Sequence, residues 1–245
     1  MDTTLVKGLD ILEALAASRE ARGITELAAE LGLMKSNVHR LLQTLAGCGY
    51  VRKDAATGRY LCSLKMWKIG GQIAEHLDLR TAARPYLRAL AEKTGETVHL
   101  SLLEGTQALY VDKIDSPQPV IAYSRLAGGG PAHCSATGKA LLAYAPADVV
   151  ARVAKDLTRF TSRTIVDEAK LAQEIRTIRK HGYATTRGEW HEAVSGLAAP
   201  IFGAPGAAIA AVGISGPSER LQLTRLRALA PIVIATARDI TEELG

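Results

Sequence analysis

Apolar residues in the first fifty positions recur with the period of amphipathic helices. A first helix is predicted over residues 4–17, and a second, short one from Thr25, a favoured N-cap type, to Gly32. A third is predicted over residues 35–45. The apolar stripes of the first and third helices are formed by Leu5, Leu9, Leu12 and Leu15, and by Val38, Leu41, Leu42 and Leu45.

A β-hairpin and a connecting helix are predicted to follow. Residues 50–53 and 59–62 are β-prone runs, and the glycine-containing segment between them is typical of a hairpin loop. From Leu64 to about Leu79, apolar residues at helical spacing predict a linker helix. We therefore expect three parts: an N-terminal domain at 1–66, a linker helix at 67–79 and a larger domain at 80–245.

The larger domain alternates between helical and strand patterns. Helices are predicted over residues 81–94, about 137–145 and 168–181, and strands over 97–103, 108–114, 120–124, 194–202 and 207–215. A glycine-rich loop at 128–131 precedes the second of these helices. Helical spacing returns after Ser218, with Pro231 as a start or a kink. The fold class is therefore predicted to be α+β, with an antiparallel sheet.

Composition excludes several classes of protein. The chain is 47% hydrophobic and 22% charged, which is typical of globular rather than disordered or fibrous proteins. No apolar run approaches the roughly 20 residues that span a bilayer, and the N-terminus does not resemble a signal peptide. We expect a soluble, cytoplasmic protein with no membrane partner. The three scattered cysteines indicate neither disulfides nor a metal site.

Basic residues are concentrated in one segment. Residues 35–68 hold seven lysines and arginines against the single acid Asp54, whereas the rest of the chain is close to balanced. Such a local excess is typical of a surface that binds a polyanion. On charge alone, a solvated basic surface is the better interpretation.

The third predicted helix carries residue types that read base edges. Its apolar stripe leaves Ser36, Arg40 and Gln43 on the opposite face and Asn37 at the edge of that face. Arginine can pair with guanine, and asparagine can pair with adenine. With the following hairpin as a wing, this predicts a winged helix-turn-helix; a helical bundle for protein contacts is the alternative. The residues expected to contact double-stranded DNA are Thr25, Lys35, Ser36, Asn37, His39, Arg40, Gln43, Thr57 and Arg59.

Longer motifs resemble the IclR family of bacterial transcription regulators. In the N-terminal domain the resemblance rests on ITELA at 24–28, KSNVHRLLQTL at 35–45, GYV at 49–51 and GRY at 58–60. In the larger domain it rests on HCSATGKALL at 133–142, HGYA at 181–184, GLAAPI at 196–201 and ISGP at 214–217. The resemblance is specific because several long motifs follow one another in the order found in the family, over essentially the whole chain.

The resemblance implies a GAF-like effector-binding domain. Carried over by position, its pocket includes Ala136, Thr137, Thr186, Val194, Gly196, Gly213 and Ser215. Neighbouring candidates are Gly130, Gly138, Arg187, Glu189 and Trp190, with Arg187 as a carboxylate partner and Trp190 as a pocket wall or a cover of the core. Some family members have an acidic residue where this chain has Thr186-Arg187, and cysteine where it has Gly196, which should enlarge the pocket.

The start of the helix near Ala136 indicates the chemistry of the effector. Free backbone N–H groups and the positive end of the helix dipole suit a carboxylate there. The hydroxyls of Thr137 and Ser215 could add hydrogen bonds. A small organic acid is therefore the expected effector.

Catalytic motifs fail when they are tested residue by residue. Gly138-Lys139 lacks the first glycine and the final hydroxyl residue of a phosphate loop, and Gly213–Gly216 meets Pro217 where a nucleophile elbow needs glycine. The six histidines show no metal-ligand spacing. No catalytic residue, metal or cofactor is predicted.

The predicted function is that of a ligand-responsive regulator, with a repressor of a catabolic operon as the favoured form. It would bind a palindromic operator as a homodimer or tetramer. The sequence leaves the effector, the sign of its action, the operator and the oligomer size open. The alternative is a metabolite-binding enzyme with a regulatory DNA-binding head, which turnover of the bound ligand would reveal.

Overall fold

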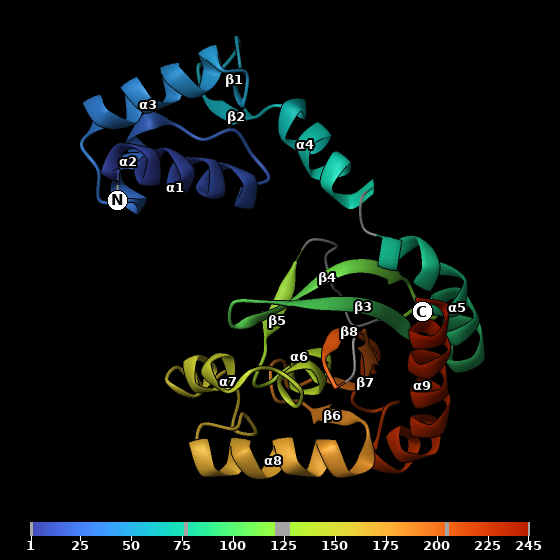
Figure 1. The fold of residues 1–245 in the computed structure, drawn as a ribbon. Coiled ribbons are helices and arrows are strands. Elements are labelled where there is room, and N and C mark those ends of the chain that lie inside the picture. Colours follow the sequence, from blue (N-terminus) through green and yellow to red (C-terminus); the bar gives the residue numbers. More distant parts are fainter. Residues whose placement is uncertain (1, 76–77, 121–127, 204–205, 245) are drawn as a thin grey trace. The chain divides into compact units, whose positions relative to one another are not determined.

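The computed structural model describes residues 2–75, 78–120, 128–203 and 206–244. The chain divides into two compact units, Met1–His76 and Leu77–Gly245. Figure 1 shows the elements of each unit. In the part of the chain that is described, no helix is long and apolar enough to cross a membrane.

The N-terminal unit has the predicted order of three helices and a hairpin. Its elements are α1 (Thr3–Ala17), α2 (Ile24–Glu30), α3 (Lys35–Gly47), β1 (Val51–Lys53), β2 (Tyr60–Cys62) and α4 (Leu64–Glu75). The strands pair antiparallel, and their core partners come from all three helices. Ile11, Leu27, Val38 and Leu42 are fully buried there. This helix-turn-helix with a hairpin confirms the fold predicted from periodicity.

The start of α2 differs from the prediction. The helix begins at Ile24, with Gly23 as the N-cap, so Thr25 lies in the first turn and is exposed. The Glu26 carboxylate accepts a hydrogen bond of 3.4 Å from the Gly23 N–H group. Because this carboxylate satisfies the free N–H group at the helix start, no threonine cap is needed.

The C-terminal unit is built on one antiparallel sheet of six strands in the order β5-β4-β3-β8-β7-β6. This arrangement confirms the predicted α+β class. The strands are β3 (Thr97–Glu104), β4 (Gln107–Ile114), β5 (Gly129–Pro131), β6 (Ala184–Arg187), β7 (Val194–Phe202) and β8 (Ala208–Pro217). The helices are α5 (Asp78–Thr94), α6 (Ala136–Leu142), α7 (Ala147–Ala154), α8 (Glu168–His181) and α9 (Leu223–Glu243).

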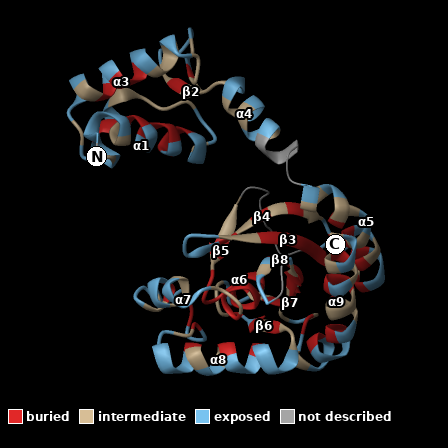
Figure 2. Ribbon diagram, viewed as in Figure 1, coloured by how far each residue is buried: buried red, intermediate tan, exposed pale blue. Residues whose placement is uncertain are grey.

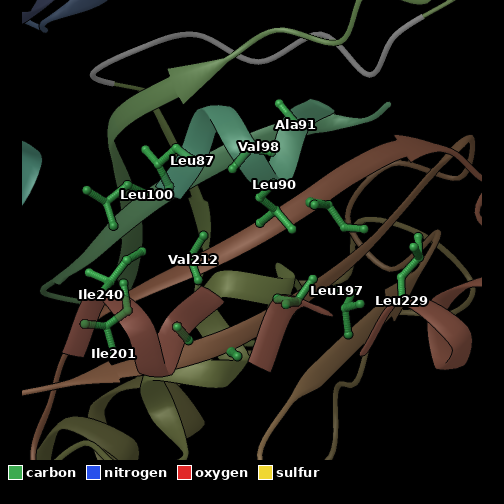
Figure 3. Packing of buried hydrophobic residues seen from close by; sticks show 14 of the residues in the cluster. Leu87, Leu90, Ala91, Val98, Leu100, Leu197, Ile201, Val212, Leu229 and Ile240 are labelled. Atoms are coloured by element: carbon green, nitrogen blue, oxygen red, sulfur yellow. The ribbon is translucent and has the colours of Figure 1, made fainter. Parts of the chain in front are cut away.

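Large apolar side chains cover one face of the sheet. Leu87 and Leu90 of α5 and Ile240 of α9 pack on Leu100 of β3 and Val212 of β8 (Figure 3). Since side chains alternate between the two faces of a strand, the residues between these apolar positions point to the opposite face. The positions that alternate with this apolar layer therefore form the face of the sheet on which α6 lies.

Small and polar residues occupy that opposite face. Ala198, Ala211 and Gly213 lie there, and α6 packs closely against them with almost every residue buried (Figure 2). A methyl group at Gly213 would lie 3.0 Å from Cγ2 of Thr137 and 2.8 Å from Cβ of Ala198. Small side chains on β7 and β8 thus let the first turn of α6 approach the sheet.

Several elements depart from the sequence-based expectations. Residues 129–131, predicted as loop, form the edge strand β5, where a Cβ at Gly129 would lie 2.4 Å from the carbonyl oxygen of Ala108. Helix α7 and strand β6 were not predicted, and Pro231 lies inside α9 rather than at its start. Of the strand predicted over 120–124, Val120 lies in a bend, and the remainder lies outside the described residues.

Candidate functional site

Helix α3 presents the predicted polar face to solvent. Lys35, Ser36, His39, Arg40 and Gln43 are exposed and Asn37 is half-buried, because Val38, Leu41 and Leu42 hold the opposite face in the core. The turn between α2 and α3 contains Gly32 at a φ of 63°, a left-handed conformation that glycine adopts without strain. The backbone therefore forms a helix-turn-helix with α3 as its exposed second helix.

Two of these residues are held by neighbours. The Gln43 amide donates a hydrogen bond of 3.4 Å to the Tyr60 hydroxyl and lies 3.5 Å from Nε2 of His39. Arg40 is exposed and has no side-chain hydrogen bond or ion pair with any residue that the structure describes. Arg40 is therefore a long cation on α3 whose side chain is exposed to solvent.

The hairpin separates the two predicted wing residues. Thr57 is exposed in the hairpin loop, where its hydroxyl donates to Asp54 Oδ2 at 2.5 Å. Arg59 instead lies beside α2: its Nε donates to the Ala21 carbonyl at 2.7 Å, and its guanidinium pairs with Glu26. Arg59 is thus held against α2 by an acid 33 positions away in sequence, and its expected contact with DNA stays a prediction.

The C-terminal unit contains a cavity of about 50 Å³ at the start of α6. Its walls are formed by strands β3, β4, β6, β7 and β8, by the start of α6 with the two residues before it, and by the segment before β7. The residues that line it are His99, Tyr110, Cys134, Ser135, Ala136, Thr137, Thr186, Trp190, His191, Val194, Ser195, Gly196, Gly213, Ile214 and Ser215. Eight of the twelve residues predicted for the effector pocket are among them.

The other four predicted residues do not line the cavity. Gly130 lies against the Trp190 ring, and Gly138 lets α6 pack on Ala132, whose Cα would be 2.5 Å from an added Cβ. Arg187 is exposed. Glu189 points to α6, where its Oε1 lies 3.0 Å from Nζ of the buried Lys139. Gly130 contacts the wall through the ring of Trp190, whereas Arg187 is not shown to contact it.

Seven of the lining residues were not predicted from the sequence, and His99 and Tyr110 are two of them. Both come from strands whose polar positions had no assigned partner. The alternation of β3, with Val98 and Leu100 in the apolar layer, is the signal that could have placed His99 on the α6 face. The pairing of β3 with β8, which puts His99 opposite Gly213, is not visible in local sequence.

Burial favours the uncharged forms of three groups in the wall, His99, Tyr110 and Cys134. It lowers the pKa of His99 to about 4, and it raises the pKa values of Tyr110 and of the Cys134 thiol to about 12. None of the described lining residues is Asp, Glu, Lys or Arg. The cavity therefore offers hydroxyl groups, an imidazole and the N–H groups at the start of α6 to a small polar molecule.

Glycine at position 196 leaves room between two lining residues. A Cβ there would lie 3.2 Å from Cβ of Ala136 and 3.2 Å from Oγ1 of Thr186. Any side chain would thus push into the cavity wall. This geometry agrees with the expectation that glycine makes the pocket larger than cysteine would.

Two family models match the chain. The IclR helix-turn-helix domain matches residues 4–55, and the C-terminal domain of the bacterial transcriptional regulator IclR matches residues 71–242. Together they cover both units.

Curated relatives and a solved structure match over nearly the whole length. The HTH-type transcriptional regulator KdgR of Escherichia coli is 33% identical over 99% of this chain and 93% of its own. The transcriptional repressor IclR of the same species is 31% identical over 99% and 90%. The crystal structure of the Thermotoga maritima IclR superposes with a TM-score of 0.77 at 28% identity, covering 100% of both chains. The chain belongs to the IclR family of bacterial transcriptional regulators.

Proposed function

We propose that the protein is a ligand-responsive repressor that binds a palindromic operator of a catabolic operon through α3. The observation that carries this proposal is the exposed polar face of α3, which includes Lys35 and Arg40, in a chain whose second unit contains a cavity lined in part by polar residues. Arginine suits a guanine edge in the major groove, and Lys35 suits a phosphate. The repressor name of the 31% identical relative supports the sign of the response.

The proposed effector is a small organic acid. A carboxylate needs several donors when it leaves water, and the first turn of α6 supplies N–H groups beside the hydroxyls of Thr137 and Ser215. The cavity volume of about 50 Å³ has room for only a few water-sized groups, which favours a small molecule. Acid binding would change operator affinity through a coupling of about 1–3 kcal/mol.

A homodimer or tetramer is proposed as the binding form. Leu64 and Trp67 of α4 are 83% and 79% exposed, and Leu5 and Leu9 of α1 are also exposed. Large apolar side chains exposed to water favour a covering partner, and a second copy would supply the second DNA-reading head of a palindrome. Sedimentation of the full chain at micromolar concentration checks this. A single 26.0 kDa species would remove the basis of paired heads.

The proposed function is tested in two stages. Carboxylic acids are first screened by thermal shift, because a ligand that binds only the folded state raises the melting temperature. Any acid found is then added to a gel-shift titration with the operator. Operator release by the acid supports the proposal, whereas unchanged operator affinity with every acid in the screen overturns the ligand response.

Two variants then locate the acid. Ser215→Ala removes one neutral hydrogen bond and should weaken acid binding by about 0.5–1.5 kcal/mol. Thr137→Glu places a like charge at the proposed carboxylate site and should abolish the response. Both should still bind the operator without acid, which also shows that they fold. Parental acid affinity in Thr137→Glu would move the pocket elsewhere and leave the DNA-binding proposal standing.

The same screen addresses the enzyme alternative. We propose that the bound acid is not consumed, since the relatives are named as regulators. Incubation of the protein with the acid, followed by NMR of the small molecule, would reveal turnover.

A further inference from the structure

His99 is tied to the cavity wall on two sides. Its Nε2 lies 2.9 Å from the Ser215 hydroxyl on the neighbouring strand β8. Its ring stacks on Tyr110 of β4, with 4.5 Å between ring centroids and 25° between planes. Both partners line the same cavity. The imidazole is thus held in one orientation.

The second nitrogen of this ring is Nδ1, which lies inside the protein. Nδ1 of His99 is buried and makes no hydrogen bond with any residue that the structure describes. His99 is only 3% exposed. A buried polar atom without a partner is costly, so the fold favours anything that supplies one at this place.

We propose that His99 is a specificity-determining residue of the effector pocket, whose Nδ1 binds an uncharged hydroxyl or carbonyl oxygen of the effector. This inference rests on the proposed function. It narrows the effector to a small acid that carries an oxygen substituent besides its carboxylate. An unsubstituted acid would leave Nδ1 without a partner.

The state of the imidazole fits this role. Burial, assisted by the charge of Lys113, lowers the pKa of His99 to about 4, so the ring is neutral at pH 7 and carries one proton. The Ser215 hydroxyl can donate to Nε2 or accept from it, so Nδ1 is a donor in one tautomer and an acceptor in the other. A hydroxyl on the effector matches either tautomer, and a carbonyl matches the donor.

Three acids of the same carbon skeleton test the proposal by calorimetry on the full chain: propanoate, 2-hydroxypropanoate and 2-oxopropanoate. We expect at least one of the two oxygen-substituted acids to bind about tenfold more tightly than propanoate, because only they can satisfy Nδ1. Equal binding of all three, or binding of none, overturns the proposal. If propanoate releases the operator as effectively as the two substituted acids, the role of His99 is wrong and the proposed function still stands. If no acid of the screen releases the operator, the proposed function is wrong.

Two matched variants assign the effect to Nδ1. The amide of His99→Gln reaches the position of Nε2 and keeps the partner of Ser215, but it leaves nothing at Nδ1. The amide of His99→Asn occupies the position of Nδ1. We expect the preference for the substituted acid to fall to about one in His99→Gln and to persist in His99→Asn. The opposite result overturns the assignment. Operator binding without acid checks that each variant folds.

One measurement needs no substitution. In ¹⁵N-histidine-labelled protein, the Nδ1 resonance of His99 should shift on addition of the substituted acid that binds more tightly and should not shift with propanoate. The main competing explanation is a buried water, since Oγ of Ser101, two residues along β3, is also buried without a partner. A water shared by these atoms would leave the Nδ1 resonance unchanged by every acid, and this result overturns the proposal.

Discussion

A methyl group at Gly130 would lie 2.8 Å from Cζ3 of Trp190. This close approach explains how a glycine outside the cavity belongs to the proposed site. The edge strand β5 brings its backbone against the indole, and the indole in turn forms part of the cavity wall.

Gly130→Ala should therefore weaken acid binding several-fold without touching the acid. The added methyl group lies closer than real Cβ contacts allow, so the indole must move. Calorimetry with the acid found in the screen measures the effect. Gly70→Ala is the matched control, because a Cβ there has no heavy atom within 4 Å. Parental acid affinity in Gly130→Ala would show that Trp190 is not a wall of the binding site.

Arg40→Ala should reduce operator binding by about 1–3 kcal/mol, the range for an arginine that pairs with a base. The fold should survive, because Arg40 is exposed on α3. Gel-shift titration measures the affinity. Arg152→Ala removes the same charge from an exposed position in the C-terminal unit and serves as the control. Equal losses in the two variants would indicate a general charge effect rather than a base contact.

His99 should make the stability of the C-terminal unit depend on pH. Its pKa in the folded state, about 4, lies below the ordinary value of 6.5, so the unfolded chain binds more protons between these values. Stability is therefore lost as pH falls from 6.5 to 4. Between pH 7 and pH 5 the wild type should lose about 2 kcal/mol more than His99→Gln. Urea unfolding at the two pH values measures this difference, and identical losses would contradict it.

Local pattern was sufficient for the helix-turn-helix and insufficient for the cavity. The exposed face of α3 follows from the spacing of Val38, Leu41 and Leu42, which is a property of a single helix. The neighbours of His99 depend on how β3 pairs with β4 and β8, and Ser215 lies 116 positions away in sequence. A strand of three residues such as β5 carries too little pattern to be recognised, and its glycines read as a loop.

Charged residues show the same limit. Arg59 and Glu189 have residue types that suit DNA and effector contacts, and both are engaged inside the protein instead. Arg59 pairs with Glu26, and Glu189 pairs with Lys139, 50 positions apart. Composition places such residues near a function, whereas the tertiary fold decides which of them remain free.

Lys139 carries the last prediction. Its side chain is 1% exposed, and its Nζ lies 2.8 Å from Oε1 of Glu174 on α8 and 3.0 Å from Oε1 of Glu189. Among the described residues, Oε2 of Glu189 is buried without a partner, and burial raises the pKa of this carboxyl.

Lys139→Met removes the shared cation and leaves two carboxylates facing each other, which should destabilise the C-terminal unit by roughly 3 kcal/mol. The double variant Lys139→Met/Glu189→Gln should recover much of this loss. Trp67 and Trp190 are the two tryptophans of the chain, and only Trp190 lies in the C-terminal unit. Urea unfolding of the full chain, followed by Trp190 fluorescence in a Trp67→Phe background, therefore reports on this unit. The loss should be smaller at pH 5 than at pH 7, because a folded-state pKa above the unfolded value makes stability fall as pH rises. If the Lys139→Met protein is as stable as the wild type at both pH values, the ammonium group of Lys139 does not stabilise the contact between α6, α8 and the segment that contains Glu189.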